Sequence, residues 1–184
     1  MIDVICGPMF SGKTEELIRR LRRLQYANSK FLLVKPTIDD RYDKIKITSH
    51  NKTSIESIPI QVPGEITHWL SENPDVTTIA IDEVQFLSND IVHICNDLDP
   101  NYNIIVAGLD MDYKGRPFEV MQLFLPLADH IKKLSAVCVK CGADAKMSHR
   151  LSDGRNIVDV GGAEKYEARC KKCWLGLTTH PQQS

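Results

Sequence analysis

The chain has 184 residues, with 23 Lys and Arg against 24 Asp and Glu, which leaves a formal net charge of −1. At about 150 residues per domain, this length predicts one main domain with room for a small appendage. The neutral balance excludes a polycation built to hold nucleic acid, and no apolar run reaches the ~18 residues that span a bilayer. The chain also lacks the basic start and the apolar core that are typical of a secretory signal. We therefore expect a cytoplasmic chain with neither membrane nor nucleic acid as a partner.

Short β-branched runs alternate with helix-like stretches along most of the chain. The runs predict strands at residues 2–6, 31–34, 45–48, 55–60, 76–81 and 103–108. Apolar residues at helical spacing predict helices at residues 14–27, 64–72, 88–98 and 119–128, the third of them capped by Ser88. Strands that alternate with helices are typical of a mainly parallel sheet covered on both faces. The predicted fold class is therefore α/β.

The composition changes after Lys133, where the chain becomes rich in Gly, Lys and Cys and poor in long apolar periods. We predict a domain boundary at residues 134–137. This divides the chain into a larger unit, residues 1–137, and a small one, residues 138–184.

One segment matches the phosphate-loop pattern G-x-x-x-x-G-K-[ST] in full. It consists of Gly7, Pro8, Met9, Phe10, Ser11, Gly12, Lys13 and Thr14. A predicted strand precedes it and a predicted helix follows, which is the context that the motif requires. The glycines allow backbone N–H groups to point at phosphate oxygens, and the helix N-terminus adds positive potential. In this pattern Lys13 reaches the β- and γ-phosphates of ATP, and the Thr14 hydroxyl binds Mg²⁺.

Two acids, Asp82 and Glu83, follow the buried run at residues 76–81. The carboxyl end of a parallel strand borders the crevice where such sheets bind ligands. Asp82 is then placed to share the Mg²⁺ with Thr14, and Glu83 to act as general base. The spacing leaves open whether Glu83 activates water, as in an ATPase, or a substrate hydroxyl, as in a kinase.

Two CxxC pairs, Cys138 with Cys141 and Cys170 with Cys173, predict a Cys₄ site for structural zinc. A closed Cys₄ shell has no open position, so we expect no chemistry at the metal. Residues 142–169 between the pairs are either a lid whose two ends the zinc holds, or the plain β-hairpin of a zinc ribbon.

Two other functions remain open at this point. Four arginines between residues 19 and 23 would suit a nucleic-acid-dependent ATPase with a zinc-ribbon binding module, although no aromatic residues for base stacking lie between them. The chain could also be a nucleotide-binding regulatory module without catalysis, in which Glu83 would have no catalytic role.

Several segments together resemble the type II thymidine kinases. They are the phosphate loop, Asp-Glu-Val-Gln-Phe at 82–86, Lys-Pro-Thr-Ile-Asp-Asp-Arg at 35–41, Val-Gly-Gly-Ala-Glu-Lys-Tyr at 160–166 and the two CxxC pairs. The resemblance extends from Met1 to about Trp174. It implies a RecA-like phosphate-loop domain with a zinc-ribbon lasso domain that closes over the nucleoside, in a homotetramer. It also implies transfer of the ATP γ-phosphoryl group to the 5′-hydroxyl of thymidine or deoxyuridine, giving dTMP in nucleotide salvage.

The same resemblance implies roles for individual residues. Glu83 would deprotonate the 5′-hydroxyl, Asp39 and Arg41 would lie near the phosphates, and Gln85 would border the nucleotide site. The residues expected around the nucleoside are Met9, Phe86, Leu109, Tyr113, Ser148, Ile157, Val158, Asp159, Val160, Gly161 and Tyr166. Of these, Ser148 is expected near the base, while the backbone of 157–161 and the Tyr166 side chain are expected to close over it.

Overall fold

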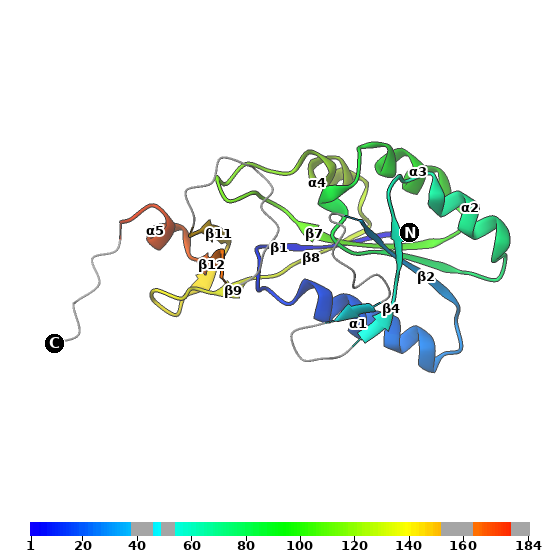
Figure 1. Ribbon diagram of the computed structural model, residues 1–184, viewed down its shortest axis with the longest axis horizontal. Coiled ribbons are helices and arrows are strands. Elements are labelled where there is room, and N and C mark those ends of the chain that lie inside the picture. The colour runs from blue at the N-terminus through cyan, green and yellow to red at the C-terminus, as the bar shows by residue number, and fades with distance from the viewer. Residues whose placement is uncertain (38–45, 49–53, 152–163, 178–184) are drawn as a thin grey trace.

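This computed structural model describes residues 1–37, 46–48, 54–151 and 164–177. Its centre is a six-stranded sheet in which every neighbouring pair of strands is parallel (Figure 1). In spatial order the strands are β5 (Ile58–Ile60), β2 (Phe31–Pro36), β6 (Thr78–Ile81), β7 (Asn103–Leu109), β1 (Ile2–Gly7) and β8 (His130–Lys133). The predicted α/β fold with a mainly parallel sheet is confirmed.

Helices cover both faces of this sheet. Helix α1 (Lys13–Tyr26) lies on one face, and α2 (Glu65–Glu72), α3 (Asp90–Leu98) and α4 (Glu119–Phe124) lie on the other (Figure 1). Two short 3₁₀ helices, η1 (Val84–Phe86) and η2 (Leu125–Leu127), complete the larger unit. No helix among the described residues is long and apolar enough to cross a membrane.

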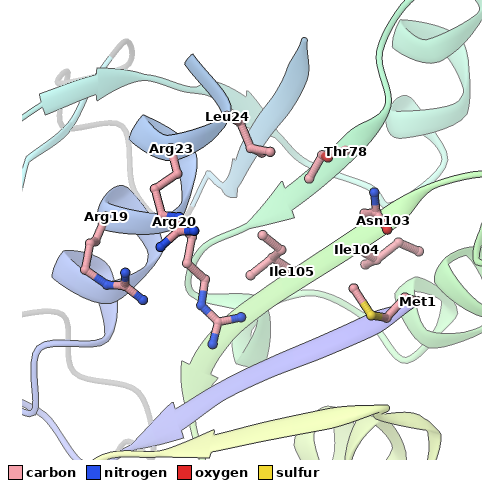
Figure 2. Close-up of a pocket in the computed structure, with 9 residues that line it drawn as sticks. All are labelled: Met1, Arg19, Arg20, Arg23, Leu24, Thr78, Asn103, Ile104 and Ile105. Atoms are coloured by element: carbon pink, nitrogen blue, oxygen red, sulfur yellow. The ribbon is translucent and has the colours of Figure 1, made fainter. Parts of the chain in front are cut away.

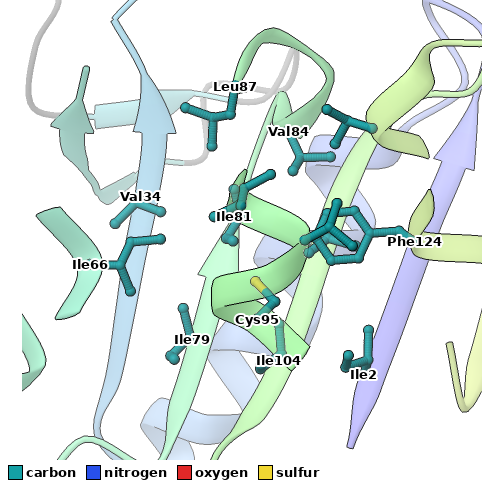
Figure 3. Packing of buried hydrophobic residues seen from close by; sticks show 14 of the residues in the cluster. Ile2, Val34, Ile66, Ile79, Ile81, Val84, Leu87, Cys95, Ile104 and Phe124 are labelled. Atoms are coloured by element: carbon teal, nitrogen blue, oxygen red, sulfur yellow. The ribbon is translucent and has the colours of Figure 1, made fainter. Parts of the chain in front are cut away.

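The core follows from the strand period. Because successive strand residues point to opposite faces, Ile79 and Ile81 enter one apolar cluster while Ala80 between them enters the other. In the larger cluster, Phe124 and Cys95 from the helices pack onto strand side chains such as Ile104 (Figure 3). Burial of each large apolar side chain stabilises the fold by about 1.5–3 kcal/mol.

A group of short elements follows the sheet, at the end of the molecule toward which β1 runs (Figure 1). Strand β9 (Ala136–Val137) pairs antiparallel with β10 (Asp144–Ala145), and β11 (Met147–Arg150) pairs antiparallel with β12 (Tyr166–Arg169), before α5 (Lys171–Trp174). We call the described residues 136–151 and 164–177 the ribbon. Elsewhere, β3 (Lys46–Thr48) and β4 (Ser54–Glu56) form a separate two-stranded sheet.

Strand β8 is absent from the sequence prediction. All four of its side chains are exposed and two are lysines, so it carries no alternating apolar signal. It pairs with β1 alone, at the edge of the sheet, where polar and charged side chains are tolerated.

Several predicted boundaries are wrong, and three of them have a visible local basis. Helix α3 begins at Asp90 with Asn89 as its N-cap, and Ser88 Oγ instead contacts the Asp90 carboxylate at 3.1 Å. Helix α4 ends at Phe124 and a 3₁₀ turn follows, because Pro126 has no N–H for helical bonding. The run predicted at residues 55–60 divides at Ser57 into strands of two different sheets.

Candidate functional site

The phosphate loop lies between β1 and α1, on the side of the sheet where the carboxyl ends of the parallel strands lie. Gly12 has φ 82° and forms the N-cap of α1, so the helix N-terminus faces into the loop. At Gly7, with φ 151°, a Cβ atom would lie 2.5 Å from the Leu134 carbonyl oxygen. The turn from strand to loop therefore requires glycine there.

Lys13 points back into the loop. Its Nζ donates to the Pro8 carbonyl oxygen at 2.7 Å, and the Ser11 hydroxyl donates to the same oxygen at 2.8 Å. Burial lowers the pKa of Lys13, while the nearby carboxylates, Glu83 first, oppose that effect. The loop thus holds a buried amine beside several acidic side chains.

Asp82 and Glu83 follow β6, as the sequence predicts. Thr14 Oγ1 donates to Asp82 Oδ2 at 3.1 Å, which joins the loop to the acidic pair. Burial and then the charge of Glu83 raise the pKa of Asp82 to about 7. A hydroxyl and a buried carboxylate side by side are hard oxygen ligands that fit Mg²⁺, whose charge favours the ionised carboxylate. Glu83 has a left-handed backbone, with φ 52°.

Gln85 connects Glu83 to the neighbouring strand. Its Nε2 donates to Glu83 Oε2, and its Oε1 accepts from the Leu109 backbone N–H at 3.0 Å. Gly108 leaves the space for this amide, because a Cβ there would lie 2.7 Å from Gln85 Oε1. Both polar atoms of the amide are therefore hydrogen-bonded within the protein, and one of the two partners is the predicted base.

The residues expected around the nucleoside fall into two groups. Phe86 contacts the ring of Phe118 edge to face, with centroids 6.3 Å apart. The guanidinium carbon of Arg150 lies 5.2 Å from the centroid of the Tyr113 ring. The Tyr113 carbonyl oxygen accepts a hydrogen bond from Trp174 Nε1 at 3.3 Å. Arg150 and Trp174 both belong to the ribbon.

Ser148 and Tyr166 lie on adjacent strands of the ribbon, and both are buried. Ser148 Oγ accepts a hydrogen bond from the backbone N–H of Met9 at 3.0 Å. The ribbon and the phosphate loop are therefore in direct contact. The remaining predicted site residues lie outside the described part of the chain: Asp39, Arg41, Ile157, Val158, Asp159, Val160 and Gly161.

The four predicted metal ligands form one cluster. The Sγ atoms of Cys138, Cys141, Cys170 and Cys173 all lie within 4.8 Å of one another, and the Cys141 and Cys170 sulfurs are 3.7 Å apart. A tetrahedron with Zn–S bonds of about 2.3 Å places its sulfurs about 3.8 Å apart, so the cluster fits zinc. The Cys173 N–H donates to Cys170 Sγ at 3.4 Å and lowers the pKa of that thiol, which favours the ligating thiolate.

A pocket of about 360 Å³ lies beside α1 at the amino ends of β6 and β7, opposite the phosphate-loop edge (Figure 2). Arg19, Arg20 and Arg23 contribute to its lining. Glu16 accepts from both Arg19 and Arg20, and Asp3 also accepts from Arg20. Carboxylates thus pair with two of the four arginines in this stretch.

Asp110 is a buried acid that the sequence analysis missed. It follows β7 as Asp82 follows β6, so the same reasoning from strand ends could have found it. One of its oxygens lies 2.8 Å from Lys133 Nζ.

The sequence model of the family described as thymidine kinase matches residues 1–174. This match covers the phosphate loop, the acidic pair and the whole cysteine cluster. The chain belongs to the thymidine kinase family. A kinase of this family requires a phosphate donor and a nucleoside acceptor. The carboxyl edge of the sheet brings together the loop for the first and, at Phe86 and Tyr113, the residues expected beside the second.

Proposed function

We propose that this chain transfers the γ-phosphoryl group of ATP to the 5′-hydroxyl of thymidine, or of deoxyuridine, and so produces dTMP in nucleotide salvage. One observation carries the proposal. In a chain of the thymidine kinase family, Thr14 Oγ1 bonds Asp82 Oδ2 at 3.1 Å, and Glu83 follows directly beside them. Candidate metal ligands and a candidate base thus lie next to the phosphate loop.

The phosphate loop binds the triphosphate through its backbone N–H groups and the N-terminus of α1. Lys13 moves from the Pro8 carbonyl to the β- and γ-phosphates, where anionic oxygens compensate for its burial. Mg²⁺ held by Thr14 and Asp82 would neutralise charge that develops on the transferred group. Asp39 and Arg41 are proposed to contact the phosphates as well.

Glu83 is the proposed general base. It accepts the proton of the 5′-hydroxyl as the oxygen attacks the γ-phosphorus, so that the hydroxyl oxygen gains the phosphoryl group and ADP leaves. Gln85 holds one carboxylate oxygen of Glu83 by a hydrogen bond. The other oxygen of the same carboxylate is the one proposed to meet the nucleoside.

The nucleoside is proposed to lie between Phe86 of the larger unit and Ser148 and Tyr166 of the ribbon. Met9, Leu109 and Tyr113 complete its pocket, and the backbone of residues 157–161 closes over the base. A polar edge matched by backbone groups discriminates strongly against bases that pair poorly with it. Closure also excludes water, which limits wasteful ATP hydrolysis.

We further propose that residues 1–137 and 138–184 are separate domains, and that the chain assembles as a homotetramer. Light scattering of the purified protein measures the latter directly. A mass corresponding to a monomer at micromolar concentration would contradict it.

One assay tests the activity. The purified chain is given Mg-ATP with thymidine, deoxyuridine, deoxycytidine, single-stranded DNA or no acceptor, and nucleoside monophosphate and ADP are both measured. We expect dTMP from thymidine and dUMP from deoxyuridine. ADP release that depends on DNA, with no monophosphate formed, would instead favour the nucleic-acid-dependent ATPase.

A variant tests the base. Glu83→Gln is expected to lower kcat by about 10²–10⁴-fold, the usual contribution of general base catalysis, while Mg-ATP binding is retained. Glu119→Gln, at an exposed site in the first turn of α4, is the matched control. Near-normal turnover of Glu83→Gln would show that Glu83 is not the base.

A further inference from the structure

Phe10 connects the phosphate loop to the ribbon. Although it belongs to the loop, its side chain packs against the apolar cluster inside the ribbon. The buried members of that cluster are Ala136, Cys138, Ala145, Ala168 and Cys173. Two of the four clustered cysteines therefore belong to the surface on which Phe10 packs.

The preceding residue makes a second, polar contact. The backbone N–H of Met9 donates to Ser148 Oγ at 3.0 Å, and Ser148 is only 4% exposed. The Ser148 hydroxyl is held in place as an acceptor, because the strand that carries it, β11, pairs along its length with β12. Two consecutive residues of the loop are thus held by the ribbon, one by packing and one by a hydrogen bond.

The backbone of Phe10 explains why the loop needs this support. Its φ of 64° lies in the left-handed region, which is unfavourable for a residue with a Cβ atom. Such a conformation persists where the surroundings hold it in place. The packed ring and the neighbouring N–H bond provide that restraint.

The ribbon has only a small apolar core of its own. Its buried apolar cluster consists of alanines and cysteines beside two two-stranded sheets, and such a small apolar core is marginal by itself. A metal bound by the four thiolates contributes folding free energy directly.

We propose that Phe10 and Ser148 are positioning residues through which the ribbon holds the phosphate loop in its nucleotide-binding shape. Zinc at the four cysteines and Mg-ATP at the loop then stabilise each other, since coupling between two sites is reciprocal. This extends the ribbon's part beyond a nucleoside lid. It rests on the proposed function only in taking Mg-ATP as the ligand of the loop.

The test measures zinc release from the full zinc-loaded chain. Transfer of zinc to the chromogenic chelator 4-(2-pyridylazo)resorcinol is timed with and without saturating Mg-ATP, in the absence of nucleoside. We expect Mg-ATP to slow release at least about fivefold in the original chain, the lower end of common coupling strengths. In Phe10→Ala and in Ser148→Ala, this protection is expected to fall below about twofold.

Two control variants make the result specific. Ser148→Thr keeps a hydroxyl acceptor and is expected to keep the protection. Phe31→Ala removes a half-buried ring that packs on the α1 side of the sheet, away from the ribbon, and is expected to leave the protection unchanged. Zinc content and circular dichroism check that each variant is folded. If Phe10→Ala fails to retain zinc, Ser148→Ala, which removes a single acceptor, decides the matter.

Two results would overturn the proposal: unchanged zinc release on addition of Mg-ATP to the original chain, or full protection in the Ser148→Ala variant. The outcome is separate from that of the nucleoside assay. A chain that shows protection but phosphorylates no nucleoside refutes the proposed function alone. A chain that phosphorylates thymidine but shows no protection refutes only the coupling.

Discussion

Asp110 and Lys133 form an ion pair across the end of strand β1. Asp110 follows β7 and Lys133 ends β8, and β1 lies between these two strands with Cys6 paired to both. The carboxylate is buried, and the lysine, 2.8 Å away, is half-exposed. The pair thus crosses the point at which β1 becomes the phosphate loop. Asp110 also acts electrostatically on Lys13, where it opposes the effect of burial on the lysine's pKa.

Removal of the lysine from this pair is expected to destabilise the fold. Lys133→Met leaves the buried Asp110 carboxylate without its cation, which costs about 1–3 kcal/mol of unfolding free energy. The double variant with Asp110→Asn is expected to lose less, because no charge is then left unpaired. Urea unfolding followed by circular dichroism measures both. Lys132→Met, the exposed neighbour on β8, is the control and should change stability by no more than about 0.5 kcal/mol.

Displacement of the Gln85 amide is expected to impair turnover more than substrate binding. Gly108→Ala places a methyl group 2.7 Å from Gln85 Oε1, and Gln85→Met removes both hydrogen bonds of the amide. Because Glu83 then loses its fixed orientation, kcat is expected to fall about 10–100-fold in either variant. Steady-state kinetics with thymidine and Mg-ATP separate kcat from KM. Gly64→Ala, where nothing lies within 4 Å of the added methyl, serves as the control. A tenfold rise in KM for ATP at unchanged kcat would show that Gln85 acts on the nucleotide instead.

Phe124 is expected to be among the most important side chains for stability. It is fully buried in the larger apolar cluster, where α4 packs on the sheet. Phe124→Ala leaves a cavity and is expected to lower the unfolding free energy by about 3–5 kcal/mol. Leu123→Ala on the same helix is the control, since Leu123 is 40% exposed and leaves little cavity. Equal losses of the two variants in thermal or urea unfolding would contradict the prediction, because burial in the core would then not distinguish Phe124 from Leu123.

Acid is expected to weaken the fold through Glu16. Hydrogen bonds from Arg19 lower the pKa of Glu16 to about 2, against burial, and Arg20 adds to the effect. Since the group titrates near 4.5 when unperturbed, the unfolded chain binds more protons between these two values. The contribution of Glu16 is therefore present above about pH 4.5 and is lost as the pH falls toward 2. Unfolding of the original chain and of Glu16→Gln across this range measures it. The stability difference should narrow as the pH falls, and a constant difference would contradict the prediction.

Much of the site can be predicted from local sequence because its parts are contiguous. The phosphate loop, the acidic pair at 82–83 and each CxxC turn carry their chemistry within a few residues. Their approach to one another also follows from the α/β pattern, since the carboxyl ends of parallel strands meet at one edge of a sheet. Residues 38–45 and 152–163, which contain Asp39, Arg41 and the proposed lid, lie outside the described structure, so their expected roles stay predictions.

The sequence by itself determined the fold class, the phosphate loop, the acidic pair and the four cysteines that cluster, because periodicity and short motifs encode local geometry. Only the tertiary structure decided which distant groups meet: Met9 with Ser148, Phe10 with the ribbon core, and Asp110 with Lys133. None of these pairs has a fixed spacing in the chain. Each depends on how β1, β7, β8 and the ribbon pack together, and on the left-handed turn at Phe10 that no local preference would predict.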